Sequence, residues 1–373
     1  MGGRPFFSAF ALILASACAT LPNVPHPKLT LLSSVSRHGE LEPCGCSSNA
    51  QGGFTREANL LKKLKSGLGP YHLSVNVGTT FAPVLPDTLA HEREAYSLKA
   101  HYVVRSLNEI GLDVLSPSAA DFSLGLDTLL TLKREAKFHF VSGNLLSVDG
   151  KPLFEQSVEY VLAGHRVVIT SVTHFAWSKG WKIDPRVTVG RPVDALRSLL
   201  ERLGHPDFVI LLSDLPEYER NQLVALFPEI RMVIGAEESP HPQRLEQMGD
   251  NTVTLNLESR AREIGRTSLT LGPRGLSFFN PQYAQYLSAQ RNWRAAKIAE
   301  LMSRLEPSDR VTIGELKSYL DKTLRVPLRP AENQLEYSSE VIPLDGSLDT
   351  GPNGLTAIIE EYKEALRTSA LRR

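Results

Sequence analysis

The stretch LLSSVSRHGELEPCGCSSNAQGGFTR, from Leu31 to Arg56, decides the fold of this chain. Its apolar beginning completes a run over residues 29–35 that predicts a buried β-strand. After a polar, glycine-rich loop, residues 55–65 (TREANLLKKLK) place three leucines on one face of a predicted helix. A strand, a polar loop and a helix in this order indicate an α/β domain.

The loop begins with Ser36, Arg37 and His38, directly after the predicted strand. Open α/β sheets bind ligands at the carboxyl ends of their strands, so these side chains are candidates for a functional site. A serine hydroxyl, however, lacks the anionic oxygen that a hard divalent cation prefers, and the neighbouring arginine brings positive charge. The loop therefore has the position of a metal-binding loop without a suitable set of ligands.

Strand-like and helical segments alternate through the next two hundred residues, which predicts a layered α/β domain. The predicted strands cover residues 72–77, 114–115, 138–141, 159–162, 165–172, 208–212, 231–234, 252–257 and 266–271. The predicted helices between them cover residues 92–110, 125–135, 195–203 and 217–226. From residue 281 the segments 284–305, 312–323 and 355–371 are helical in pattern, so we expect residues 281–373 to form a helical C-terminal extension of a domain at 28–280.

The composition excludes some classes of partner. The 373 residues include 41 basic and 41 acidic side chains, and this balance gives no support to a nucleic-acid partner. After the N-terminus, the chain has no stretch apolar enough to span a membrane.

The first residues are typical of an export signal. Arg4 precedes an apolar run, and small residues lead to Cys18. This pattern resembles a bacterial lipobox, so residues 1–18 are predicted to be a signal peptide with lipidation at Cys18, and 19–27 an extended tether. Ordinary cleavage near Ala17 or Ala19 is the alternative. Because alanine follows the cysteine, the resemblance implies sorting to the periplasmic face of an outer membrane.

The blocks along residues 28–271 resemble, in their order, the calcineurin-like metallophosphoesterases of the 5'-nucleotidase type. The resemblance is nearest to a bacterial exported subgroup that opens with HG-x-LEPCGC and GG-x-x-R, which here is His38 to Arg56. It implies a four-layer α/β/β/α sandwich and a two-metal site on loops at the carboxyl ends of the strands. The final helix with Tyr362 also resembles that subgroup.

Nearly all the ligand positions that the resemblance implies carry other residues. Ser36 replaces an aspartate, Thr79 replaces the bridging aspartate, Ala119 an asparagine and Ala120 the catalytic histidine, while Asp214, Glu237 and Ser239 replace ligand histidines. Only His38 remains. Two divalent ions about 4 Å apart need a bridging ligand and a full donor set, so the resemblance implies a protein that has lost its metals and its catalytic residues.

The remaining carboxylates leave other hypotheses open. Asp121, Asp214, Glu237 and Glu238 could gather near His38 and bind one calcium or magnesium ion, or they could be solvated loop ends. Alternatively, Arg37 could pair with Glu237 or Asp214 in place of the metals.

Cys44 and Cys46 also allow several interpretations. A Cys-x-Cys disulfide would close a strained ring, two thiolates with His38 would be one ligand short of a zinc site, and packing as small residues needs no chemistry. We favour a structural role in the loop.

The sequence thus predicts a catalytically inactive, exported lipoprotein without a cofactor. It is attached to the membrane by lipid and binds or scaffolds an unidentified envelope protein. One alternative is a divergent phosphoesterase with a single divalent metal on His38, Asp214 and Glu237. The other is a redox or metal-handling protein built on the two cysteines.

Overall fold

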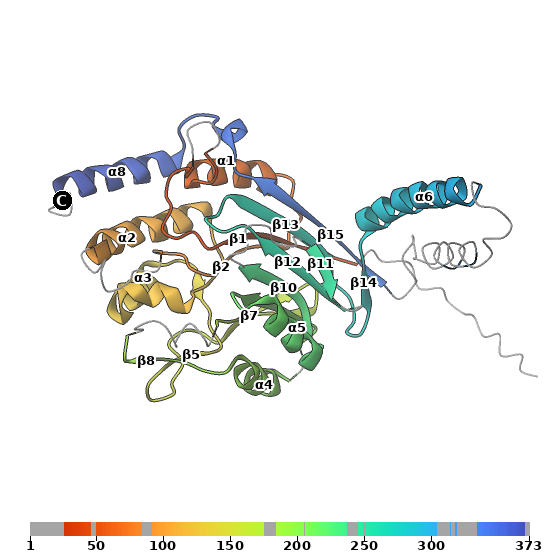
Figure 1. Cartoon of the computed structure of the whole chain (residues 1–373). Coiled ribbons are helices and arrows are strands. Elements are labelled where there is room, and N and C mark those ends of the chain that lie inside the picture. Colours follow the sequence, from red (N-terminus) through yellow and green to blue (C-terminus); the bar gives the residue numbers. More distant parts are fainter. Residues whose placement is uncertain are drawn as a thin grey trace, which may run out of the picture.

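The computed structural model describes residues 26–45, 50–83, 92–174, 184–204, 206–236, 245–248, 251–303, 314, 318 and 334–369. Two large sheets form its centre (Figure 1). The first sheet has the order β14-β15-β13-β1-β2-β3-β4. Its strands are β1 (Lys28–Val35), β2 (His72–Val77), β3 (Val114–Ser116), β4 (His139–Phe140), β13 (Glu263–Thr270), β14 (Ser277–Phe279) and β15 (Gln334–Pro343).

The second sheet has the order β11-β12-β10-β9-β7-β6. Its strands are β6 (Ser157–Leu162), β7 (His165–Val172), β9 (Phe208–Ser213), β10 (Ile230–Ala236), β11 (Leu245–Met248) and β12 (Thr252–Leu257). Strands β6 and β7 form a hairpin about Gly164. Strands β5 (Leu145–Ser147) and β8 (Val187–Val189) pair separately.

Neighbouring parallel strands bring loops that are distant in sequence to one edge of each sheet. Strand β1 runs parallel to β2, with Val35 opposite Val77, and β2 runs parallel to β3. In the second sheet β9 lies parallel between β7 and β10. The carboxyl ends of these strands therefore lie together, which is where the sequence places its candidate residues.

Apolar side chains pack in separate layers. The inner faces of the two sheets meet in a core that includes Leu31, Val75, Ile210 and Ile234, all at most 1% exposed. Strands β9 and β10 bury both faces, and they are almost continuously apolar. The burial pattern is that of a four-layer α/β/β/α sandwich, as the sequence predicts.

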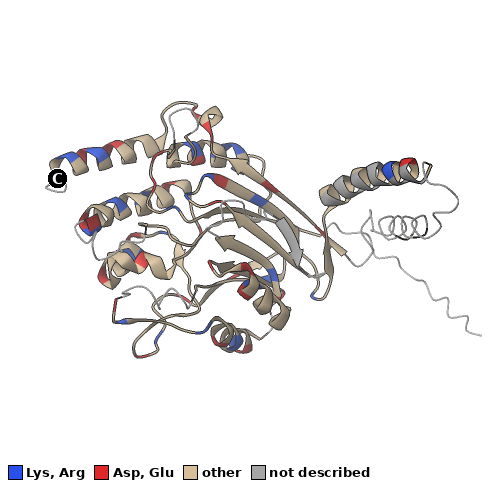
Figure 2. Cartoon of the chain, in the orientation of Figure 1, with Lys and Arg blue, Asp and Glu red and all other residues tan. Residues whose placement is uncertain are grey.

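Helices cover the outer faces. Helices α1 (Phe54–Lys65), α2 (Arg93–Ile110), α3 (Leu126–Glu135) and α8 (Gly354–Thr368) share one apolar cluster on the first sheet. Helices α4 (Pro192–Leu203) and α5 (Glu217–Leu226) pack on the second. Both basic and acidic residues lie along α2 and α8 (Figure 2).

The carboxyl-terminal region differs from the prediction in one element. The prediction that residues 281–373 form a helical extension misses strand β15. This strand pairs antiparallel with β13, with Tyr337 opposite Leu269 at one end and Pro343 opposite Glu263 at the other. Helix α6 (Pro281–Ser303) agrees with the prediction, while most of the predicted helix 312–323 lies outside the described residues. In β15, Leu335 and Tyr337 point inward, as the period of two in a strand requires. Prolines and charged residues around them make this apolar-polar alternation hard to recognise in the sequence.

The last helix is packed on the domain rather than separate from it. Leu355 and Ile359 of α8 are at most 5% exposed and belong to the core of the first helical layer. Tyr362 meets Tyr102 of α2 with ring centroids 5.4 Å apart. In the part of the chain that the structure describes, no helix is long and apolar enough to cross a membrane.

Candidate functional site

The loops after β1, β2 and β10 converge tightly at the carboxyl edge of the sheets. The backbone N–H of Ser36 donates to the carbonyl of Val77 at 2.8 Å. A Cβ added to Gly78, which has a φ of +86°, would lie 2.6 Å from Ser36 Oγ and 2.9 Å from the Ala236 Cβ. The space between these loops is therefore filled by small side chains.

His38 lies in a constrained turn beside this contact. Its φ is +52°, and its backbone N–H donates to the carbonyl of Thr79 at 3.1 Å. Burial and the nearby Arg260 guanidinium lower the pKa of His38 to about 4. The imidazole is therefore neutral at pH 7, in the protonation state that a metal ligand needs.

Arg37 points away from the site. Its Nη2 donates to Glu57 Oε1 at 2.6 Å and to Ser34 Oγ at 2.9 Å, and its guanidinium lies 4.4 Å from the centroid of the Phe54 ring. The prediction that Arg37 pairs with Asp214 is wrong, because helix α1 brings Glu57 beneath the loop. Glu237, the other predicted partner, lies outside the described residues.

A buried carboxylate organises the loops after β2 and β3. Asp121 accepts backbone hydrogen bonds from Thr80 (2.8 Å), Phe81 (2.9 Å) and Ser118 (3.0 Å). Thr79 Oγ1 lies 3.1 Å from Ser118 Oγ. Thr79 therefore has a hydrogen-bonding partner where the resemblance implies a metal-bridging aspartate, and both oxygens of Asp121 already accept hydrogen bonds from the protein.

The residues that replace the asparagine and the catalytic histidine lie in a short helical turn, η2 (Ala119–Leu124). Ala119 and Ala120 are both 2% exposed. The backbone N–H of Ala119 donates to Thr173 Oγ1 at 3.2 Å, and that of Ala120 donates to Ser118 Oγ at 3.1 Å. Their methyl groups offer nothing that could bind a metal or move a proton.

Asp214 belongs to a second network, at the ends of β7 and β9. Its Oδ2 accepts from Thr173 Oγ1 at 2.8 Å, and its Oδ1 accepts from the backbone N–H of His174 at 3.0 Å. His174 Nε2 in turn lies 3.1 Å from Glu219 Oε1. Burial raises the pKa of Asp214 to about 6 and that of Asp121 to about 7.

Two residues of this network are missing from the sequence-based site. The side-chain amide of Asn144 donates to the carbonyl of Thr173 at 2.9 Å, and its Oδ1 accepts from the Thr173 N–H at 2.9 Å. Thr173 directly follows a predicted strand, as Ser36 does, and Asn144 comes three residues after the predicted strand 138–141. The rule that ligands gather at the carboxyl ends of strands would therefore have found them.

The described donor set does not fit a two-metal centre. The described residues contain no cluster of three or more His, Cys, Asp or Glu side chains that could hold a metal ion. Ser36 Oγ and the Ala236 methyl group crowd Gly78, and the oxygens of Asp121 and Asp214 accept hydrogen bonds from the protein. Glu237, Glu238 and Ser239 lie outside the described residues.

Solved structures identify the fold. Over 94% of this chain and 100% of the other, the calcineurin-like phosphoesterase YfkN of Bacillus subtilis matches with a TM-score of 0.62 at 14% identity. A 5'-nucleotidase precursor from Thermus thermophilus matches with a TM-score of 0.61 at 16% identity, over 91% of this chain and 59% of that one. This is the metallophosphoesterase fold of the 5'-nucleotidase type. No family model matches the chain, and no curated protein does.

Other neighbours with the metallophosphoesterase fold carry different activities in their names. The sulfate thiohydrolase SoxB of Thermus thermophilus matches with a TM-score of 0.63 at 13% identity, over 93% of this chain and 62% of that one. This chain spans about three fifths of the length of the Thermus 5'-nucleotidase precursor. At these identities the likeness concerns the fold alone.

The cysteine loop lies beside the candidate site. Cys44 forms an isolated antiparallel bridge with Gln51, and its Sγ lies 3.8 Å from Arg260 Nη1. The same Arg260 atom donates to Glu40 at 2.9 Å. Cys46 and the predicted lipidation site Cys18 lie outside the described residues. The structural role that we favour for the cysteine loop therefore stays a prediction, and a Cys44–Cys46 disulfide stays an alternative to it.

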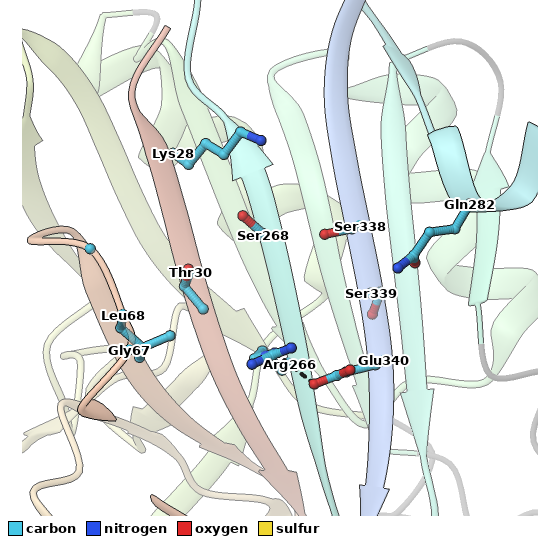
Figure 3. A pocket seen from close by; sticks show the side chains of 11 residues that line it. Lys28, Thr30, Gly67, Leu68, Arg266, Ser268, Gln282, Ser338, Ser339 and Glu340 are labelled. Carbon is cyan, nitrogen blue, oxygen red and sulfur yellow. Dashed lines mark ion pairs between the residues drawn. The ribbon is translucent and has the colours of Figure 1, made fainter. Parts of the chain in front are cut away.

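A polar groove of about 380 Å³ opens elsewhere on this fold, on the outer face of the first sheet (Figure 3). Thr30, Ser268 and Ser338 line it from the neighbouring strands β1, β13 and β15. Arg266 and Glu340 pair across it at 2.6 Å, with both side chains about two-fifths exposed. Because its charged groups already pair in solvent, we interpret this groove as ordinary polar surface.

Proposed function

We propose that this protein is a catalytically inactive metallophosphoesterase-like lipoprotein that binds or scaffolds another envelope protein. One observation carries the proposal. Where the fold would place its metal-bridging and proton-donating residues, this chain has Thr79 and Ala120, and both take part in hydrogen bonds within the protein. A metal-bound hydroxide needs the ligands that these positions would supply.

The neighbouring contacts support the same conclusion. A metal site without its metals would leave carboxylates close together without positive charge. Here Asp121 accepts hydrogen bonds from three backbone N–H groups. Asp214 accepts one hydrogen bond from a hydroxyl and one from a backbone N–H group, and Arg37 pairs with Glu57. These protein contacts hold the loops in place, which suits a binding domain that has kept its shape.

The location of the protein is also part of the proposal. The apolar N-terminal run and Cys18 suit export and lipidation, and a 5'-nucleotidase precursor among the structural neighbours is consistent with a secreted protein. We place the protein on the periplasmic face of the outer membrane. Its partner there is a protein and not a nucleic acid, since basic and acidic residues balance.

Metal analysis tests catalytic inactivity directly. The purified mature protein is incubated with manganese and zinc, desalted and analysed by mass spectrometry, while hydrolysis of bis-(p-nitrophenyl) phosphate and AMP is followed. We expect no stoichiometric metal and no hydrolysis above buffer. About two equivalents of metal with turnover would overturn the proposal.

The alternative function, a phosphoesterase with one metal on His38, Asp214 and Glu237, gives a different result. It requires about one equivalent of metal and a hydrolysis that a chelator abolishes. The variant His38→Ala would then lose both the metal and the activity, whereas the matched variant His139→Ala would keep both. His139 is surface-exposed and pairs with Glu155 at 2.9 Å, which makes it a suitable control.

Cell fractionation tests the lipid anchor. In a bacterial host, the wild-type protein is expected in the membrane fraction and labelled by an alkyne-modified palmitate, while Cys18→Ala moves to the soluble fraction without label. The control Cys44→Ala should remain in the membrane with full labelling. Equal release of both variants would contradict lipidation at Cys18.

A further inference from the structure

A cavity lies at the opposite end of the second sheet from the candidate site. It has a volume of about 250 Å³ and is lined by Asp207, Glu229, Arg231, Arg274 and the backbone around Gly275. Arg231 is the second residue of β10, whereas the candidate site begins after the last residue of that strand. A rise of about 3.3 Å per residue puts the two roughly 15–20 Å apart.

Arg231 is buried in an apolar setting. The residue is 2% exposed, and its guanidinium lies 5.2 Å from the ring centroid of Phe208 and 4.6 Å from that of Phe278. Its Nη2 donates to the carbonyl of Leu276 at 2.5 Å. Its Nε, which is fully buried, has no hydrogen-bonding partner in the described part of the chain.

The charge of Arg231 lacks a carboxylate partner among the described residues. Asp207, which also lines the cavity, accepts the Arg166 N–H with one oxygen and lies 3.7 Å from Arg274 Nε with the other. Burial alone lowers the pKa of Arg231 to about 10, which leaves the group charged at pH 7. Buried charges in proteins are normally paired. A charged guanidinium that lines a cavity and has no carboxylate partner among the described residues is therefore suited to bind an anion.

We propose that this cavity binds a small oxyanion, a single phosphate or carboxylate group, with Arg231 as the main ligand and Arg274 as the second. The planar guanidinium matches the oxygens of either group, and its aromatic neighbours hold it in one orientation. Because Asp207 and Glu229 line the same cavity, they repel a polyanion and limit the ligand to one anionic group. The site is independent of the proposed function and stands whether or not the former metal site is active.

Thermal unfolding with added anions tests the site and separates the two ligand sources. Inorganic phosphate and acetate are titrated separately against the full mature protein, with chloride keeping the ionic strength constant. We expect the midpoint to rise with the logarithm of the concentration of at least one of them, by roughly 4 °C when the anion reaches about 100 times its Kd. The anion with the lower Kd shows whether the site prefers a phosphate or a carboxylate group.

Variants decide whether the cavity causes the shift. Arg231→Met should abolish it and Arg274→Gln should weaken anion binding about tenfold, whereas the control Arg266→Gln, on the outer face of the first sheet, should leave it unchanged. If Arg231→Met does not fold, Arg231→Lys replaces it. We expect this variant to bind the anion at least tenfold more weakly, because an ammonium group lacks the paired N–H donors of a planar guanidinium. A wild-type midpoint that rises with neither anion beyond the chloride reference, or equal shifts in all variants, would overturn the proposal.

Discussion

The Arg37 guanidinium lies 2.6 Å from the Glu57 carboxylate, with both side chains at most 3% exposed. This ion pair joins the loop after β1 to helix α1, and it turns the arginine away from the edge where the metallophosphoesterase fold would place metals. The first loop of the candidate site is therefore stabilised from below by a buried charge pair.

Removing one partner of this pair should be strongly destabilising. Glu57→Gln leaves the Arg37 charge buried without an anion, so we expect the free energy of unfolding to fall by about 3–5 kcal/mol. Urea denaturation followed by circular dichroism measures this change. The double variant Arg37→Met/Glu57→Leu should lose clearly less than the sum of the single variants, and strict additivity would contradict a direct pair.

Gly78 should not tolerate a side chain. Gly78→Ala places a Cβ at a φ of +86° and 2.6 Å from Ser36 Oγ, so we expect a loss of more than about 2 kcal/mol in the free energy of unfolding. Gly164→Ala is the control, because that glycine also has a positive φ of +84° but has nothing within 4 Å of an added Cβ. Equal losses in the two variants would mean that the loops do not converge at Gly78.

His38 should make stability depend on pH. Its folded-state pKa of about 4 lies below the usual 6.5, so the unfolded chain binds the proton more tightly. The stabilising contribution is therefore full above pH 6.5 and is lost as the pH falls toward 4, by about 1–3 kcal/mol. His38→Gln should flatten the difference in unfolding free energy between pH 6.5 and 4.5. A slope as steep as that of the wild type would show that His38 titrates normally.

The carboxyl-terminal segment should be required for folding. A chain that ends at residue 280 would leave β13 without β15 as its neighbour and would uncover the core positions that Leu355 and Ile359 fill. We expect this truncated chain to be insoluble or to lack cooperative unfolding. A soluble truncated protein with a cooperative transition would show instead that residues 28–280 form an independent domain.

A milder change tests the same attachment in the intact chain. Arg56 donates two 2.8 Å hydrogen bonds to Asp349, one from Nε and one from Nη2, and a third to the carbonyl of Ala50. Arg56→Met should speed proteolytic cleavage near residue 350 and lower the unfolding free energy by about 1–3 kcal/mol. Arg134→Met, at an exposed site of α3, should do neither.

The order of strands and helices follows from local pattern, and the sequence predicts most of it. The apolar run before Ser36 and the leucines of residues 55–65 became β1 and α1 because their periodicity is a property of neighbouring residues. Strand β15 was not predicted, because it forms by pairing with β13, which lies more than sixty residues earlier in the chain.

The sequence by itself determined which chemical groups stand at the strand ends. A serine, a threonine and an alanine stand where the resemblance implies metal ligands, and a second alanine stands where it implies the catalytic histidine, while His38 is retained. Only the tertiary structure decided what the remaining charges do. Arg37 pairs with Glu57, and Asp121 caps the loop after β2, because helices and strands distant in sequence bring those partners within hydrogen-bonding distance. Residue type is local information, whereas the satisfaction of a buried charge depends on packing across the whole fold.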